Sequence, residues 1–519
     1  MKQIHLEVRK KEIIEVDGLK FKDLNGNGKL DPYEDWRLPA EERAKDLVSQ
    51  MNLDEKVGMM MISTQQMGKS QEDQSKTSHD GILNDEFREE KSSIFAEQKD
   101  YGNTKTIEDL HMRHFILRDN HSEYDIAQWV NAMNEVAEGT RLGIPVLIAS
   151  NSRNENVERT FGMNDAVGVF STWPGTLGLA AAALGDEKNG GDYSIFSEFA
   201  SYAKKEWLAT GIRKGYMYML DTVTDPRWQR IYGTFGESTE LISDVAKRFL
   251  LEFQGEVLGK DSIALTMKHF PGGGARENGF DPHYKEGKWN IYETPGSLEK
   301  YHLPPFEVAC KYKSSSIMPY YSIPSEEDSA PQEYKGELIP FEKVGFAFNK
   351  YFIQDLLRGK MGFKGYVNSD SGILDKMDWG VGHLAKEDKA ALAINVGVDI
   401  IADTNEVFWI KKAIEQGKIS QNRIDEANVR LFIEMFNLGL FDDKTYVDSD
   451  MATRVVEKEE AWNAAYIAHQ KSTVILKNKD GVFPLKEGTK IYVESLHKDP
   501  EVAKNYEKKQ GNLWRKEIA

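Results

Sequence analysis

Short apolar runs separated by helical patterns organise the middle of this chain. The runs cover residues 144–150, 215–220, 262–267, 315–321, 365–369 and 398–402. Segments with apolar residues at helical spacing lie between them. Strands that alternate with helices form parallel sheets, and six or more such units over roughly 300 residues predict an α/β fold of the TIM-like (β/α)8 barrel type. A doubly wound open sheet is the alternative.

Polar side chains follow these runs where each predicted strand ends. The carboxyl ends of parallel barrel strands meet at one rim, and enzymes of this fold hold their active sites there. For any single residue, a helix cap or an ordinary polar loop position is the alternative. Polar endings after all six runs favour a site built from Asn151, Asp221, Lys268, His269, Tyr320, Tyr321, Asp370 and Asp403.

The pattern divides the chain into three parts. Residues 1–38 form an N-terminal extension, 39–465 the barrel domain, and 466–519 a linker with the truncated start of a second α/β domain. Within the barrel domain, residues 68–105 are a polar insertion without sustained periodicity, for which a solvated loop and a functional arm are both open. From about Tyr466 the pattern predicts the end of a helix, then a strand, a turn and a strand.

A capping box predicts a helix near the start of the barrel domain. Apolar residues recur at helical spacing between Pro39 and Met61, and Asn52 is followed three residues later by Glu55. In this arrangement each side chain accepts a hydrogen bond from the other residue's backbone N–H. We therefore expect two helices here, with the second starting after Asn52.

Composition and charge restrict the class of protein. Of 519 residues, 40% are hydrophobic and 29% charged, and no apolar run approaches the roughly 18 residues of a membrane span. The net charge of −17 is spread along the chain, so neither nucleic-acid binding nor membrane insertion is expected. Cys310 is the single cysteine, and the first residues lack the apolar core of a signal peptide. These features predict a cytoplasmic protein without disulfides.

A twelve-residue segment near the N-terminus matches a calcium-binding loop. "DLNGNGKLDPYE" has oxygen ligands at the required spacing and a glycine at the sharp turn, Gly28. An Asx-rich turn without a metal is the alternative. The sequence predicts a solitary structural Ca²⁺ site formed by Asp23, Asn25, Asn27, the carbonyl of Lys29, Asp31 and Glu34. We expect no cofactor for catalysis.

Six motifs, taken together and in this order, resemble glycoside hydrolase family 3. The resemblance covers roughly residues 35 to 490 and favours a bacterial β-glucosidase-like branch of the family. The motifs are "RLGIPV" (141–146), "WPGTLGLAA" (173–181), "DPRWQRIYGTFGES" (225–238), "MKHFPGGG" (267–274), "HLPPFEVA" (302–309) and "GFKGYVNSDSGI" (362–373).

The resemblance implies a retaining β-glycosidase with Asp370 as its nucleophile. The Asp370 carboxylate would attack the anomeric carbon, and water would hydrolyse the glycosyl ester. Lys268, His269 and Arg230 would hold sugar hydroxyls. Two positions depart from the family pattern. Asn151 occupies the position of an aspartate that usually binds the sugar, and Ser371 replaces the tryptophan that usually follows the residue matched by Asp370. We expect Asn151 to bind the sugar and an aromatic such as Trp379 to stack on it.

The proton donor to the leaving group is not identified by these motifs. In much of the family it is a glutamate of the second domain, so a second chain or a symmetry mate could complete the site. Alternatively, Asp281 and His283 in "PGGGARENGFDPHY" resemble the Asp-x-His dyad of the N-acetylglucosaminidase branch. A histidine titrates near neutral pH and suits an acid role. Glu277 on the same segment is a third candidate.

Three functions are compatible with these residues. A β-glucosidase-like hydrolase is favoured, acting on a glycoside substrate. A noncatalytic or partner-completed glycosidase subunit and a glycoside phosphorylase are the alternatives. The polar insertion and the incomplete C-terminal part make a homo-oligomer conceivable. The sequence does not assign the sugar, the linkage or the aglycone of the substrate.

Overall fold

The computed structural model describes residues 2–90, 98–155, 169–185, 190–456 and 458–490. Its internal contacts divide the chain into two units, Met1–Ser472 and Thr473–Ala519. The first unit contains the barrel and all of the predicted site residues.

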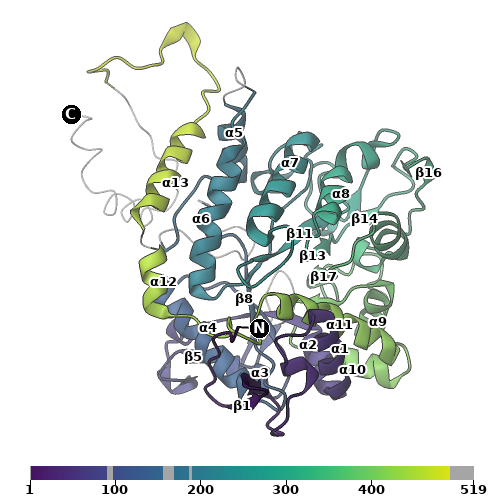
Figure 1. Cartoon of the computed structure of the whole chain (residues 1–519). Coiled ribbons are helices and arrows are strands. Elements are labelled where there is room, and N and C mark those ends of the chain that lie inside the picture. The colour runs from purple at the N-terminus through teal and green to yellow at the C-terminus, as the bar shows by residue number, and fades with distance from the viewer. Residues whose placement is uncertain (1, 91–97, 156–168, 186–189, 457, 491–519) are drawn as a thin grey trace. The chain divides into compact units, whose positions relative to one another are not determined.

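Eight parallel strands close into a barrel in the first unit (Figure 1). They are β3 (Met61–Gln65), β8 (His114–Leu117), β9 (Leu147–Ser150), β10 (Lys214–Gly215), β11 (Ala264–Phe270), β13 (Ser316–Pro319), β17 (Tyr366–Ser371) and β18 (Ile400–Ala402). Neighbours in the barrel follow chain order, and β18 pairs with β3 to close the ring. The predicted TIM-like (β/α)8 barrel is confirmed, and the open sheet is excluded.

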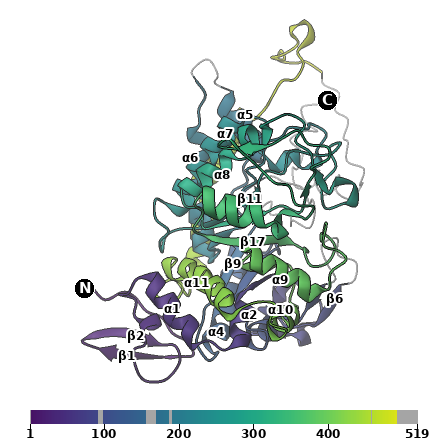
Figure 2. The same ribbon diagram turned by 90° about the vertical axis from the view of Figure 1, so that its right-hand side faces the viewer.

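Helices follow the strands and surround the barrel (Figures 1 and 2). They are α3 (Asn103–Glu108), α4 (Glu123–Glu138), α5 (Thr176–Leu184), α6 (Ser194–Thr210), α7 (Thr239–Phe249), α8 (Pro304–Lys311), the π-helix η10 (Tyr351–Lys360), α9 (Lys386–Val396), α10 (Phe408–Glu415) and α11 (Gln421–Asn437). Two further helices, α12 (Ser449–Val456) and α13 (Glu459–Lys471), end the first unit.

The predicted helices at the start of the barrel domain are present. Helix α1 (Ala40–Gln50) packs beside α11, and α2 (Leu53–Met59) begins at the predicted cap. The Asn52 side chain accepts from the Glu55 backbone N–H, and the Glu55 carboxylate accepts from the Asn52 N–H. The chain then enters β3 at Met61, so the predicted helical segment extended slightly too far.

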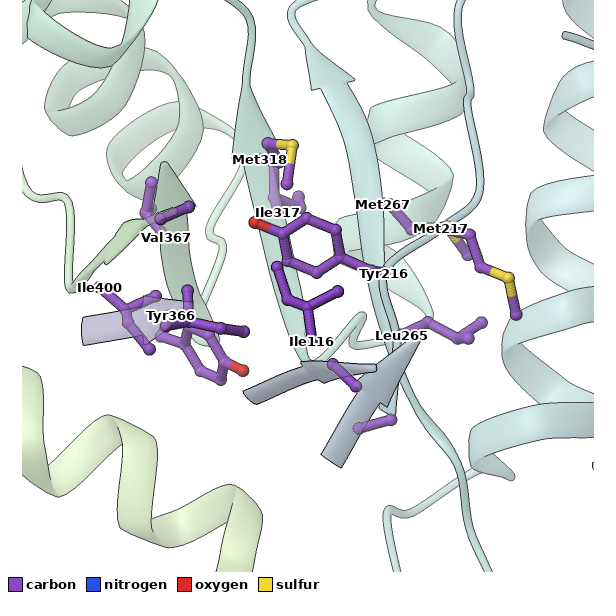
Figure 3. Close-up of a cluster of buried hydrophobic side chains, with 14 of the residues drawn as sticks. Ile116, Tyr216, Met217, Leu265, Met267, Ile317, Met318, Tyr366, Val367 and Ile400 are labelled. Carbon is purple, nitrogen blue, oxygen red and sulfur yellow. The ribbon is translucent and has the colours of Figure 1, made fainter. Parts of the chain in front are cut away.

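The barrel strands contribute hydrophobic side chains to one continuous core. Figure 3 shows part of it, including Ile116 of β8, Leu265 of β11 and Val367 of β17, all almost completely buried. The core also encloses an ion pair, in which Nζ of Lys214 lies 2.8 Å from Oε2 of Glu434. Buried charges are tolerated only when they are paired in this way.

The N-terminal extension, the insertion and the C-terminal unit have little regular structure. Strands β1 (Glu12–Val16) and β2 (Leu19–Asp23) form a hairpin whose turn residues, Asp17 and Gly18, have the positive φ angles of a type I′ turn. The insertion holds short strand pairs: β4 (Thr77–Ser78) with β5 (Leu83–Asn84), and β6 (Arg88–Glu90) with β7 (Gln98–Asp100).

The described part of the C-terminal unit contains one short 3₁₀ turn, η11 (Lys479–Gly481), and no strand within 473–490. The predicted strand–turn–strand is therefore absent from that segment. Its backbone has no neighbouring strand to pair with, and its apolar residues, such as Leu476 at 93% exposure, are not covered within the described residues. The rest of the predicted second domain, 491–519, lies outside the described residues.

Candidate active site

Two irregularities in the strands coincide with the predicted site residues. The register of β11 shifts between Lys268 and Phe270, and that of β17 shifts between Asn368 and Ser371. In a regular strand, successive side chains point to opposite faces. A bulge re-aims one of them, and bulges are common next to active sites. The irregularities allow Lys268 and His269, and likewise Asp370 and Ser371, to lie on the same side.

Asp370 is the last but one residue of β17, and its two carboxylate oxygens have different surroundings. Oδ1 accepts a hydrogen bond of 2.8 Å from the backbone N–H of Ser371. Oδ2 lies 3.8 Å from Nε2 of His269, and burial, together with the charge and a side-chain hydrogen bond of Asp370, raises the pKa of the neighbouring Tyr321 hydroxyl well above its ordinary value. Asp370 is only 8% exposed, so Oδ2 lies inside the barrel mouth and is largely shielded from bulk water. Asp370 is not a helix cap.

His269 is held in one orientation by Asp221. Its Nδ1 lies 2.8 Å from Oδ2 of Asp221, and its ring packs on Tyr320 at 4.5 Å between centroids. Burial lowers the pKa of His269, although the Asp221 charge opposes this effect. The imidazole is therefore neutral near pH 7, with the proton on Nδ1 facing the carboxylate and Nε2 free to accept.

Lys268 and Arg230 supply positive charge beside Asp370. Nζ of Lys268 donates to the carbonyl of Tyr216 at 2.8 Å, and burial together with the Arg230 charge lowers the Lys268 pKa to about 8. Arg230, on the 3₁₀ helix η5 (Gln229–Gly233), reaches Nε2 of His269 at 3.4 Å and the hydroxyl of Tyr320 at 3.2 Å. Burial opposes its charge, but nearby carboxylates including Asp281 and Asp370 raise the Arg230 pKa above its ordinary value.

Asp281 and His283 form a hydrogen-bonded pair. Oδ1 of Asp281 accepts from both the backbone N–H and Nδ1 of His283. Its Oδ2 accepts from Nε1 of Trp228 at 2.8 Å and from the Tyr320 hydroxyl at 3.1 Å. Burial alone would raise the Asp281 pKa, but the His283 hydrogen bond and the Arg230 charge outweigh it and hold the pKa well below its usual range.

A chain of contacts joins this pair to Asp370. Tyr320 donates to Asp281 and accepts from Arg230, and Arg230 in turn reaches His269 next to Asp370. The ring of His283 also packs edge-on against Tyr321 at 5.0 Å. The structure thus brings together Asp370, Lys268, His269, Arg230, Asp221, Asp281 and His283.

Trp379 and Asn151 have less direct connections to this group. Trp379 is half-buried, and its indole N–H donates to the Pro282 carbonyl at 2.8 Å. It therefore holds the segment that carries Asp281 and His283. Asn151 follows β9 directly and is half-buried. Glu277, the third acid candidate, is half-buried on the segment that leads to Asp281.

A polar network that the sequence did not predict lies beside Asp370. Ser371 Oγ donates a hydrogen bond to Oδ2 of Asp403. The same oxygen accepts a hydrogen bond of 3.1 Å from Nη2 of Arg118. Thr64 bridges the two, because its hydroxyl accepts from Nε of Arg118 and donates to Asp403. Arg118 follows β8, a strand that the pattern did not predict, so no signal marked it as a rim residue. Trp228 was identifiable, since it lies inside the "DPRWQR" motif.

Glu155 is a second overlooked residue. It is 8% exposed, its Oε1 has no hydrogen-bond partner in the described part of the chain, and its backbone pairs with Trp173. Burial raises the Glu155 pKa to about 7, and the charge of Lys268 opposes that rise. Because Glu155 stands several residues beyond the end of β9, the rule that site residues directly follow strands could not find it.

The predicted calcium loop is closed by its own hydrogen bonds. The amides of Asn25 and Asn27 both donate to Oδ2 of Asp31, and the Asp23 carboxylate accepts backbone N–H groups of Asn27 and Gly28. Both oxygens of the buried Glu34 accept backbone N–H groups, from Leu24, Asn25 and Asp31.

The oxygen-only donor set suits Ca²⁺. However, no group of three or more His, Cys, Asp or Glu side chains is arranged to hold a metal in the described ranges. Binding would therefore require these hydrogen bonds to open, and the calcium site stays a prediction.

Within the described residues, no helix is long and apolar enough to cross a membrane.

Comparison with known proteins identifies the family. Residues 49–433 match the family model described as "Glycosyl hydrolase family 3 N terminal domain". The chain belongs to glycosyl hydrolase family 3. The match covers most of the chain and includes every barrel strand, so family 3 membership agrees with the resemblance carried by the six motifs.

Curated relatives of this family 3 chain are β-glycosidases. It is 33% identical over 521 residues to a "Periplasmic beta-glucosidase/beta-xylosidase" of Dickeya chrysanthemi, with 96% of this chain and 73% of the relative covered. It is 34% identical over 489 residues to "Beta-glucosidase C" of Emericella nidulans, with 91% and 71% covered. The family and these relatives place the chain among the β-glycoside hydrolases.

Solved structures share the fold. A β-glucosidase from Erythrobacter marinus superimposes with a TM-score of 0.67 at 21% identity, covering 88% of this chain and 53% of that one. A β-glucosidase from Listeria innocua, determined with isofagomine, gives 0.64 at 23% identity, covering 86% and 53%. The chain spans about half the length of these two solved proteins.

Proposed function

We propose that this family 3 chain hydrolyses β-glucosides with retention of configuration, through a covalent ester between the sugar and Asp370. The observation that supports this most directly is the Asp370 carboxylate itself. One oxygen is fixed by the Ser371 N–H, while Oδ2 lies in the barrel mouth at 3.8 Å from Nε2 of His269. A nucleophile requires a carboxylate that is oriented toward the substrate.

In the first step, Oδ2 of Asp370 bonds to the anomeric carbon while the bond from that carbon to the leaving oxygen breaks. His283 donates its Nε2 proton to the leaving oxygen, and Asp281 stabilises the orientation of the ring. In the second step, water attacks the same carbon, returns a proton to His283 and releases the Asp370 carboxylate. Two inversions at one carbon give overall retention.

Lys268, His269 and Arg230 would hold the sugar for this reaction. Their donors and acceptors surround Asp370, and dense hydroxyl groups need both kinds of partner. Asn151 would contribute an uncharged amide at the far side of the sugar. Trp379 would act indirectly, by holding Pro282 and thus His283 in place.

The test is the stereochemistry of the first product. Proton NMR of an aryl β-glucoside reaction, recorded before mutarotation, should show the β-anomer of glucose first. Appearance of the α-anomer would exclude a glycosyl–Asp370 intermediate, and absence of turnover would favour the noncatalytic or partner-completed subunit.

Phosphorolysis is the second candidate function. A histidine acid carries no negative charge of its own that would repel phosphate as a glutamate acid would, and Lys268 and Arg230 add positive charge nearby. Phosphate could then replace water in the second step. Product analysis with and without phosphate separates the two functions, since a phosphorylase forms glucose 1-phosphate and a hydrolase forms glucose in both cases.

The cytoplasmic location and an oligomeric state stay predictions.

A further inference from the structure

A second polar cavity lies beside the loops that carry the candidate active site. Its volume is about 490 Å³, within the range of small-molecule sites. It is lined by Thr224, Asp225, Pro226, Arg227, Ala275, Arg276, Ile291, Tyr292, Glu293, Thr294, Ser297, Tyr301 and His302. Asp370, Lys268 and His269 are not among these residues. We propose that this cavity is a second carbohydrate-binding site, which takes part of a β-linked oligosaccharide.

Buried residues form the floor of the cavity. Tyr292 and His302 are each 1% exposed, and their rings meet edge to face at 5.6 Å. Nδ1 of His302 has no hydrogen-bond partner among the described residues. Burial lowers the His302 pKa to about 4, so the ring is neutral near pH 7 and offers one donor and one acceptor. The two rings give the cavity an aromatic wall against which a sugar ring can pack.

The charges around the cavity balance. Two carboxylates, Asp225 and Glu293, and two guanidiniums, Arg227 and Arg276, line it. Asp225 and Arg227 pair in a bidentate manner, with Oδ1–Nε at 2.9 Å and Oδ2–Nη2 at 2.7 Å. A cavity of one charge sign would select an ion, whereas balanced donors and acceptors suit an uncharged polyhydroxylated ligand. Carbohydrate is the ligand class that matches this lining.

The cavity shares its loops with the catalytic residues. Thr224, Asp225 and Arg227 directly precede Trp228, and Thr224 Oγ1 donates to the Gly274 carbonyl at 2.9 Å. Arg276 lies between His269 and Asp281 in the chain. An oligosaccharide that occupies the cavity would therefore contact the same two rim segments that hold the catalytic pair. This inference concerns binding, so it does not depend on the roles proposed for Asp370 and His283.

Titration calorimetry with cellotetraose tests the proposal. The protein should carry Asp370→Asn, so that the ligand is not consumed. We expect two sites in this background and one after the further changes Arg227→Ala and Glu293→Ala, which remove exposed side chains. Arg248→Ala on α7, an arginine ion-paired with Asp244, is the matched control and should leave two sites. With Asp370 intact, the Arg227→Ala, Glu293→Ala protein should keep kcat/KM on an aryl β-glucoside within about twofold of the unaltered chain.

A single site before the cavity changes, or two sites after them, would overturn the second-site proposal and leave the proposed function untouched. No cellotetraose binding at all would also overturn it, while the anomer test decides the proposed function independently.

Discussion

His283 and Asp281 are joined by a hydrogen bond between Nδ1 and Oδ1. The Asp281 carboxylate accepts four hydrogen bonds from the described residues: two from His283, one from Trp228 and one from Tyr320. A carboxylate has about four lone-pair positions, so Asp281 has little capacity left for a substrate. The arrangement makes Asp281 the group that orients the ring, and Nε2 of His283 the atom that would transfer a proton.

Replacing His283 should affect substrates according to their leaving group. For His283→Ala, we expect kcat/KM on cellobiose to fall by about 10²- to 10⁴-fold, the usual contribution of general acid catalysis. On a dinitrophenyl β-glucoside, the first step should change little, because that leaving group departs without a proton. His383→Ala, which removes an exposed histidine, is the control. Equal effects on both substrates would show that His283 is structural.

The Lys268 charge predicts an alkaline limit to activity. Burial and Arg230 lower its pKa to about 8, so the ammonium loses its proton as the pH rises through that value. Its hydrogen bonds to sugar hydroxyls then lose their ionic character. We expect kcat/KM to decline above about pH 8. In Arg230→Met the decline should move to higher pH, since a charge that lowers the Lys268 pKa is removed. An unmoved decline would assign it to another group.

The sequence predicted the barrel because alternating strands and helices leave a strong local pattern. Six of the strands lie within or overlap the predicted runs, but β3 and β8 were missed. Strand β3, "MISTQ", follows a helix with one residue between and contains polar residues, so periodicity alone gives no boundary. Because β8 was not predicted, Arg118, which directly follows it, was not recognised as a rim residue.

The candidate site was predictable only in part, for a related reason. Asp370, Lys268 and His269 lie near the carboxyl ends of β17 and β11, and the motif resemblance supplied Arg230. The pairing of His269 with Asp221 and of Ser371 with Asp403 joins residues far apart in the chain. Such contacts depend on barrel closure and on the two strand bulges, neither of which has a local sequence signature. Within 473–490 the predicted strand structure is absent for the opposite reason, because a local strand pattern needs a pairing partner.

The buried ion pair between Lys214 and Glu434 should be important for stability. Their side chains are 0% and 2% exposed, and Glu434 also accepts from the Tyr366 hydroxyl at 2.9 Å. For Lys214→Met we expect a loss of about 3–5 kcal/mol in the free energy of unfolding, because the Glu434 carboxylate stays buried without its counter-charge. Urea denaturation measures this.

The matched control for that change is Lys260→Met. Lys260 pairs with Asp443 at 3.2 Å but is 57% exposed, so its loss should cost less than about 1 kcal/mol. Adding Glu434→Gln to Lys214→Met should recover part of the stability. Equal effects of the two lysine changes would contradict the importance of the buried pair.

Calcium binding at the N-terminal loop should depend on pH. Burial raises the Glu34 pKa to about 7, so the carboxyl must release a proton to bind the ion when the pH is below that value. We expect Ca²⁺ to raise the melting temperature more at pH 8 than at pH 6. At a concentration 100 times its Kd, Ca²⁺ should add about 2.7 kcal/mol to the free energy of unfolding.

The change Asp31→Asn removes a carboxylate ligand and should abolish the effect of calcium. The Asp31 side chain accepts the amides of Asn25 and Asn27, which an asparagine carbonyl can still do, so the loop itself should persist. Identical melting curves of the unaltered protein in calcium and in chelator at pH 8 would contradict the calcium prediction.

The central claim is that Asp370 forms a bond to the sugar. A 2-deoxy-2-fluoro-β-glucosyl fluoride slows the second step more than the first, so the glycosyl ester accumulates, and peptide mapping by mass spectrometry then locates it. The account predicts one fluoroglucosyl group per chain, on the peptide containing Asp370, together with loss of activity. A label on any other residue, or labelling of an Asp370→Asn protein at the same rate as the unaltered protein, would contradict it.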